Sequence, residues 1–319
     1  MSLPEDRSRL QTTFLGATLP TPLMNSAGVH DTTREELLDL DKALGVSVVV
    51  SKSTTLHRRD GNPHPRYFHN SILSTNSTGL ANEGHSFYGD MADHLTKPYI
   101  VSVASLGPPE EMKLVVDHLA KNPKIFAIEI NLSCPNIVGK PQPAYDFVAL
   151  DFYLGLLTFG LEKPWGIKLP PYFDTTHFEQ VAKILKRYKP HYLACINSVP
   201  LGLVIDGESE TYAIKPNQGR GGLGGQVIKP IALSNVQTFR LLMGPDLPIV
   251  GCGGIASGMD AYEHFLAGAS LVQVGTTLMR EGVEEGSARI AKELDAILLG
   301  KGIKSLGDIV PLCHRVDKV

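Results

Sequence analysis

The strongest constraint on the fold is a regular alternation of short apolar runs with longer amphipathic segments. Eight runs have the length and apolar character of buried strands: residues 23–27, 46–51, 99–104, 125–130, 165–169, 192–196, 249–252 and 271–275. Most are followed by a segment whose apolar residues recur at helical spacing: 34–44, 110–120, 147–159, 178–188, 231–243, 258–268 and 284–299. Strands alternating with helices in this order predict an α/β fold with a parallel sheet.

The number of repeats predicts how this sheet closes. Residues 1–319 contain no Pro/Gly/Ser-rich linker, so we expect one domain that forms a single (β/α)8 TIM barrel. A doubly wound open sheet is the alternative. Residues 52–85, rich in Asn, Pro and His, and residues 199–225, which contain the alternating run TYAIK, interrupt the repeat. We expect loop and hairpin insertions there, at the C-terminal mouth of the barrel.

Charge and composition exclude several classes of partner. The formal net charge of -3 gives no general attraction to nucleic acid or anionic lipid. The first residues carry acids and arginines where a secretory signal needs an apolar core, and no apolar run reaches bilayer length. We therefore expect a cytoplasmic protein without nucleic-acid or membrane partners. The cysteines and histidines lack metal-ligand spacing, so no metal is predicted.

Polar residues gather where several predicted strands end, which is where a barrel places its active site. They are Lys52, Asn131, Cys134, Lys168, Asn197 and Ser198. A lysine flanked by apolar strand residues is costly to bury, so each must reach the mouth or pair with an anionic group. A lysine that simply reaches solvent at a strand end is the plain alternative.

Glycines follow the last two predicted strands. Gly253 and Gly254 come after the seventh, and Gly275 with Thr276 after the eighth. Barrels commonly bind a phosphate at these positions with backbone N–H groups. The pair predicts a phosphorylated ligand, with two ordinary turns as the alternative.

Another glycine-rich run, GRGGLG, has Gly219, Gly221 and Gly224 at the spacing of a dinucleotide-binding loop. The preceding segment is polar and broken by proline, which does not suit the strand that such a loop requires. We therefore reject the motif and expect a flexible loop.

Cys134 differs from the other cysteines. It follows a predicted strand at the mouth, beside asparagines and within reach of lysine charge, which favours a thiolate. Such a thiol can act as a nucleophile or as a base, and spacing does not separate these roles. Cys195, Cys252 and Cys313 are expected to be small buried hydrophobic residues.

Five segments together resemble a known family: NLSCPNIVGKPQPAYDF, SKSTTLHRRDGNPHPRY, GIKLPPYFD, IKPNQGRGGLGG and GCGGIASGMDAYEHFLAGASLVQVGT. They are similar to the dihydroorotate dehydrogenases, specifically the soluble, fumarate-using class, and the similarity extends from about Met24 to Gly302. The resemblance implies an FMN-containing barrel that oxidises (S)-dihydroorotate to orotate in de novo pyrimidine biosynthesis, with fumarate as electron acceptor. It also implies a homodimer.

The resemblance assigns roles residue by residue. Cys134 is the implied base, which takes the C5 proton while hydride passes to the flavin. The implied substrate-binding residues are Lys52, Asn76, Gly79, Leu80, Asn131, Asn136, Asn197 and Ser198. The implied FMN contacts are Ala27, Gly28, Lys52, Ser53, Asn131, Lys168, Ile196, Gly225, Cys252, Gly253, Gly254, Gly275 and Thr276. Lys168 would stabilise the anionic reduced flavin ring.

Three other functions stay open at this point. One is an FMN-dependent reductase or dehydrogenase of a related unsaturated or pyrimidine substrate, including tRNA dihydrouridine. The second is a phosphate-binding barrel without flavin, such as an aldolase or isomerase. The third is a barrel that binds a metabolite without catalysis. A tRNA enzyme should carry an added basic helical region, which the sequence does not show.

Overall fold

The computed structural model describes residues 8–133 and 142–312. Its centre is a sheet of eight parallel strands: β3 (Leu23–Asn25), β4 (Val49–Val50), β7 (Tyr99–Val103), β8 (Ala127–Asn131), β9 (Trp165–Leu169), β10 (Tyr192–Cys195), β15 (Ile249–Cys252) and β16 (Leu271–Val274). The order is β3-β16-β15-β10-β9-β8-β7-β4, and a parallel bridge between Met24 and Val48 joins the two ends. The predicted (β/α)8 barrel is confirmed, and the open sheet is excluded.

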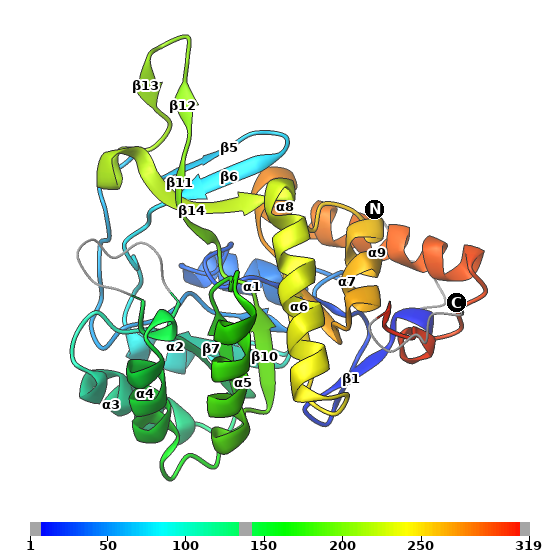
Figure 1. Cartoon of the computed structure of the whole chain (residues 1–319), viewed down its shortest axis with the longest axis horizontal. Coiled ribbons are helices and arrows are strands. Elements are labelled where there is room, and N and C mark those ends of the chain that lie inside the picture. The colour runs from blue at the N-terminus through cyan, green and yellow to red at the C-terminus, as the bar shows by residue number, and fades with distance from the viewer. Residues whose placement is uncertain (1–7, 134–141, 313–319) are drawn as a thin grey trace.

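Helices surround the barrel (Figure 1). The seven predicted ones are α1 (Arg34–Lys42), α3 (Pro109–Ala120), α4 (Phe147–Thr158), α5 (Thr175–Tyr188), α6 (Lys229–Met243), α7 (Gly258–Ala267) and α9 (Val283–Gly300). Helix α5 illustrates why they form: Asp174 caps its first turn, and Phe178, Val181, Ala182 and Leu185 bury one face. Two short helices, α2 (His85–Met91) and α8 (Thr276–Glu281), were not predicted, because one or two turns show little periodicity. No helix in residues 8–133 and 142–312 is long and apolar enough to cross a membrane.

A hairpin that the sequence did not predict closes the N-terminal end of the barrel. Its strands are β1 (Thr12–Phe14) and β2 (Ala17–Leu19), which pair antiparallel. Phe14 is buried and packs edge-on against Tyr192 of β10, with ring centroids 5.2 Å apart. Because apolar side chains fill this end, polar chemistry is confined to the opposite end of the barrel.

The two insertions join to form one antiparallel sheet at the other end of the barrel (Figure 1). Its strands, in the order β11-β14-β6-β5, are β11 (Val199–Leu203), β14 (Arg220–Gly225), β6 (Leu73–Asn76) and β5 (Tyr67–His69). The predicted hairpin is confirmed as β12 (Ile205–Asp206) and β13 (Thr211–Tyr212), which project from this sheet. Turns of 3₁₀ helix lie at η1 (Ser8–Leu10), η2 (Pro143–Tyr145), η3 (Pro216–Gly219), η4 (Gln226–Ile228) and η5 (Leu306–Asp308).

The expectation of a flexible loop at GRGGLG was wrong. Most of this run forms β14, which pairs with β6 on one side and with β11 on the other. A Cβ atom added to Gly221 would lie 2.5 Å from the backbone oxygen of Asn76, and one added to Gly224 would lie 2.7 Å from Ser74 Oγ. The glycines therefore allow β14 to pack closely against β6, which explains their spacing without a dinucleotide-binding loop.

Candidate active site

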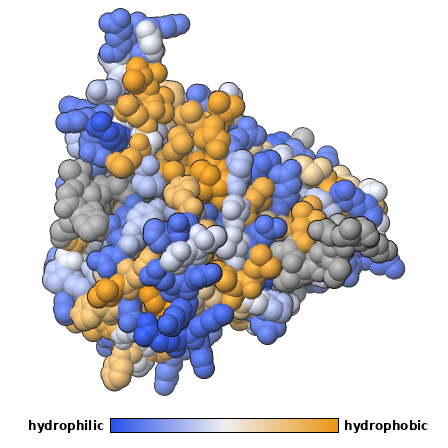
Figure 2. All heavy atoms as spheres, in the orientation of Figure 1, coloured by the Kyte–Doolittle hydropathy of each residue, from blue (hydrophilic) through white to orange (hydrophobic). Residues whose placement is uncertain are grey.

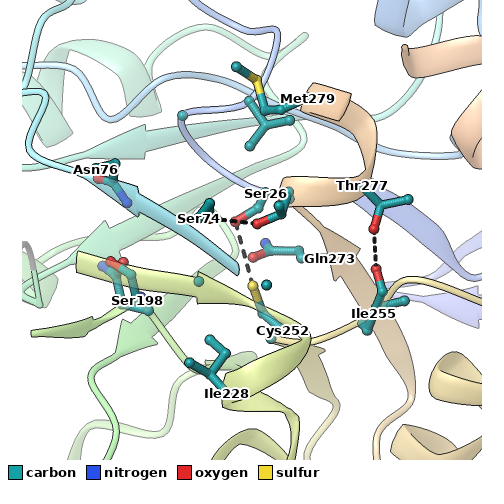
Figure 3. Close-up of a pocket in the computed structure, with 18 of the residues that line it drawn as sticks. Ser26, Ser74, Asn76, Ser198, Ile228, Cys252, Ile255, Gln273, Thr277 and Met279 are labelled. Carbon is teal, nitrogen blue, oxygen red and sulfur yellow. Dashed lines mark hydrogen bonds between the residues drawn. The ribbon is translucent and has the colours of Figure 1, made fainter. Parts of the chain in front are cut away.

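A large cavity lies at the C-terminal end of the barrel, between the strand ends and the insertion sheet. It has about 1190 Å³ of empty space, part of it open to solvent, and ligand pockets are typically about 300–1,000 Å³. Its walls come from residues 26–29, 196–198, 252–256 and 275–277 of the barrel and from β6 and β14. Figure 3 shows Asn76, Ser198 and Cys252 around it.

Most of the predicted site residues line this cavity. They are Ala27, Gly28, Lys52, Ser53, Asn76, Leu80, Asn131, Ile196, Asn197, Ser198, Gly225, Cys252, Gly253, Gly254, Gly275 and Thr276. Gly79 is not a lining residue, and Lys168 lies behind the wall rather than in it. Cys134 and Asn136 lie outside the described residues. The strand ends thus bring most of the predicted site residues together around one cavity. Their roles in binding substrate or FMN stay predictions.

Asparagine and serine side chains form a connected network at the strand ends. Asn131 Nδ2 donates to Ser53 Oγ at 2.9 Å, and Asn197 Nδ2 donates to Asn131 Oδ1 at 3.3 Å. Asn197 Nδ2 also donates to Ser133 O at 3.0 Å, and Ser133 Oγ donates to the backbone oxygen of Lys168 at 2.9 Å. Because these bonds connect several strands, the amide groups of Asn131 and Asn197 are held in fixed orientations.

Lys168 is held by a buried polar chain inside the barrel. Its Nζ donates to Gln273 Oε1 and, at 3.5 Å, to Ser26 Oγ. Gln273 Nε2 in turn donates to Glu129 Oε2 at 3.0 Å. Lys168 is 3% exposed and Glu129 is fully buried, so the two charges compensate each other through the glutamine amide. Ser26 and Gln273 line the cavity, which places the lysine charge directly behind its wall.

Lys52 is in a different environment. It is 8% exposed and lines the cavity, and its Nζ forms no hydrogen bond with residues 8–133 or 142–312. A Cβ atom added to Gly28 would lie 2.9 Å from this Nζ, so the ammonium group packs against the glycine. The nearby carboxyl group of Asp31 is fully buried, and burial raises its pKa to about 7 although the charge of Lys52 lowers it. Lys52 is therefore available to bind an anion.

The glycine turns after the last two barrel strands form a narrow part of the cavity wall. Gly254 has φ of +77°, and a Cβ atom there would lie 2.3 Å from Lys229 Cβ, so only glycine fits. The backbone of Gly275 faces open space, since a Cβ atom there would meet nothing closer than 3.8 Å. His264 Nε2 donates to Gly253 O at 3.0 Å, and burial lowers the pKa of this histidine to about 4, which keeps it neutral. This fixed backbone suits a phosphate group.

The described cysteines are both buried. Cys195 lies inside β10, where burial raises its pKa, and the expectation of a small buried residue is confirmed. Cys252 is also buried, but it lines the cavity with its Sγ 3.5 Å from Ser26 Oγ (Figure 3). Cys313 lies outside the described residues. In the described part of the chain, no group of three or more His, Cys, Asp or Glu residues is placed to hold a metal ion.

Sequence reasoning missed several residues of the site. Ser26, Ser74, Gln273 and Arg280 line the cavity, and Glu129 lies behind it. One signal was present: Glu129 and Gln273 are polar residues in the middle of apolar strands, where burial requires a partner. No local signal marked the others.

The family model for dihydroorotate dehydrogenase matches residues 9–298 of the chain. The chain belongs to the dihydroorotate dehydrogenase family. Members of this family are flavin-dependent enzymes that act on small molecules, and the cavity described above has the size and the fixed backbone that such a cofactor requires.

Individual relatives of the dihydroorotate dehydrogenase family agree with this assignment. A Streptococcus agalactiae protein named "Putative dihydroorotate dehydrogenase A (fumarate)" is 44% identical over 304 residues, which are 94% of this chain and 96% of that protein. A Streptococcus pyogenes protein with the same name is 45% identical over 90% of this chain and 92% of its own length. The crystal structure of DHODH from Eimeria tenella in complex with ferulenol has a TM-score of 0.81 at 22% identity, covers 98% of this chain and 92% of its own, and supports the fold.

Proposed function

We propose that the protein oxidises (S)-dihydroorotate to orotate with FMN as cofactor and fumarate as electron acceptor, in de novo pyrimidine biosynthesis. The observation that carries the proposal is the cavity wall, which contains the fixed amides of Asn131 and Asn197 and the ammonium group of Lys52, for which residues 8–133 and 142–312 supply no hydrogen-bond partner. A planar carboxylated pyrimidine needs a cation for its carboxylate and donors and acceptors around its ring. Asn76, Ser198 and Asn136 would complete this set.

The residues that would hold FMN lie on the barrel side of the cavity. The backbone at Gly253, Gly254 and Gly275 would bind the phosphate. Lys168, fixed by Gln273, would offset negative charge on the ring. When bound, FMN supplies the acceptor for the hydride that leaves C6 of dihydroorotate. FMN released from the denatured protein would support the assignment, whereas FAD, a nicotinamide or no chromophore would contradict it.

Cys134 is the proposed base for the C5 proton. Cys134→Ala should bind FMN and orotate nearly as the wild type does, but flavin reduction by dihydroorotate should slow by at least roughly a hundredfold, the low end for loss of a general base. Anaerobic stopped-flow absorbance measures this rate. Cys195→Ala is the matched control, because that thiol is buried inside β10 and should affect packing only. Reduction at full speed in Cys134→Ala, or an equal defect in Cys195→Ala, would mean that another group is the base.

Fumarate would react in the same cavity. It is a dicarboxylate, and Lys52 and the asparagine amides are among the groups in the cavity wall suited to carboxylate oxygens. Orotate should then compete with fumarate, and initial-velocity plots should be parallel, as expected for a ping-pong mechanism. Strict dependence on a quinone would contradict this part of the proposal.

A cytoplasmic homodimer completes the proposal. The insertion sheet and its hairpin expose large apolar side chains, including Leu201 (66% exposed), Leu203 and Ile205, and Figure 2 shows hydrophobic surface on this part of the molecule. A second copy that covers this surface would remove it from water. Light scattering should give twice the chain mass for the wild type, and Leu201→Asp should shift it toward one chain mass; a wild-type protein of single-chain mass would contradict the homodimer.

A further inference from the structure

We propose that Asp31 is a positioning residue that controls how much of the Lys52 charge is available to a carboxylate ligand in the cavity. The inference rests on the proposed function, in which Lys52 binds the substrate carboxylate. It adds a residue that belongs to none of the predicted binding sets.

Hydrogen bonds connect Asp31 both to Gly28 and to the backbone of Lys52. Its Oδ2 accepts a hydrogen bond from the backbone N–H of Gly28 at 2.6 Å, and its backbone oxygen accepts one from Lys52 N at 3.3 Å. The Lys52 ammonium group packs against the same glycine that donates to the Asp31 carboxyl group. Asp31 therefore fixes the glycine segment that supports Lys52.

The surroundings of Asp31 leave its charge poorly compensated. Its side chain is fully buried, and Oδ1 accepts no hydrogen bond from the described part of the chain. Lys52 is the cation that acts on it, whereas Glu36 of α1 adds repulsion, and Tyr88 of α2 and Tyr99 of β7 are neutral neighbours. With a pKa of about 7, the carboxyl group gains or loses its proton in the neutral range.

Two states of the site follow. When Asp31 carries its proton, the full charge of Lys52 faces the cavity. When Asp31 is ionised, it attracts the same ammonium group and repels a ligand carboxylate placed there. A bound carboxylate must in turn favour the protonated form of Asp31, because linkage is reciprocal. Binding should therefore take up a proton near pH 7, and affinity should fall as pH rises through this range.

Calorimetric titration of the FMN-loaded enzyme with orotate tests this at pH 6 and pH 8. The wild type should bind up to about tenfold more weakly at pH 8, as expected when one proton is linked to binding. Asp31→Asn keeps the shape and an acceptor for Gly28 N–H, so it should bind with nearly the same affinity at both pH values. Asp39→Asn, an exposed carboxylate of α1, is the matched control and should retain the wild-type profile.

A measurement on the wild type alone keeps the test decisive if Asp31→Asn does not fold. Titrations at pH 7 in two buffers of different ionisation enthalpy should show a substantial fraction of one proton taken up for each orotate bound. No proton uptake, or the same pH profile in Asp31→Asn and wild type, would overturn the role of Asp31 and leave the proposed function intact. Orotate that fails to bind the wild type even at pH 6 would overturn both.

Discussion

Two buried lysines, one following strand β4 and one in strand β9, differ in the partners that the fold gives them. Lys168 donates to Gln273 and Ser26, and through the glutamine its charge is compensated by buried Glu129. Lys52 forms no side-chain hydrogen bond within the residues that the structure describes, and it interacts electrostatically with Asp31, a buried carboxyl group with a raised pKa. The Lys168 ammonium group is therefore satisfied by side chains of the barrel, whereas the Lys52 ammonium group is left available for the ligand of the proposed function. What differs is the partners that the surrounding strands supply.

The largest expected effect concerns the stability of the Lys168 region. Lys168→Met should lower the free energy of unfolding by about 3–5 kcal/mol, because it leaves Glu129 as an uncompensated buried charge. Lys52→Met should change it by less than about 1 kcal/mol, since Asp31 can take up a proton near pH 7. Urea denaturation of the ligand-free proteins at pH 7 measures both. Equal losses in the two variants would remove the distinction between the two lysines.

The second effect concerns ligand affinity in the Lys52 region. Lys52→Met should weaken orotate binding to the FMN-loaded enzyme by roughly 10- to 100-fold, which corresponds to the loss of one charged hydrogen bond of about 1.5–3 kcal/mol. Isothermal titration at pH 6 gives this value. Lys186→Met, on the exposed face of α5, is the control and should bind as the wild type does. Undiminished affinity in Lys52→Met would place the carboxylate elsewhere.

The smallest effect is a pH dependence of stability that distinguishes the two regions. Burial raises the folded-state pKa of Asp31 from 3.8 to about 7, so the folded state binds the proton more tightly than the unfolded state. The stabilisation is complete below about pH 4 and is lost as pH rises through 7. Between pH 6 and pH 8 the wild type should lose about 1 kcal/mol relative to Asp31→Asn.

His264 does not obscure this pH measurement. Burial lowers its folded-state pKa to about 4, so its contribution to stability is lost as pH falls below about 6.5. Part of this loss falls between pH 6 and pH 8, but it is the same in the wild type and in Asp31→Asn, so it cancels in the difference between their unfolding free energies. Identical unfolding free energies of wild type and Asp31→Asn at each pH across this range would show that the Asp31 carboxyl group does not titrate there.

The local pattern of apolar residues in the sequence was enough by itself to predict the barrel fold. Apolar runs of four to six residues alternating with segments of helical period specify strand and helix, and eight such units close in only a few ways. The rule that function gathers at the C-terminal strand ends then singled out Lys52, Asn131 and Asn197, all of which line the cavity.

Tertiary structure alone decided the features that depend on pairing between distant segments. The hairpin at Phe14 has strands of three residues, too short for a period, and β14 joins β6 across nearly 150 residues through glycines that carry no hydrophobic signal. Asp31 meets Lys52, and Gln273 links Lys168 to Glu129, because barrel closure brings their strands together. The hydrophobic periodicity of a segment indicates which face of a strand or helix a residue occupies. The partner that the residue contacts there depends on strand register and on packing across the whole barrel.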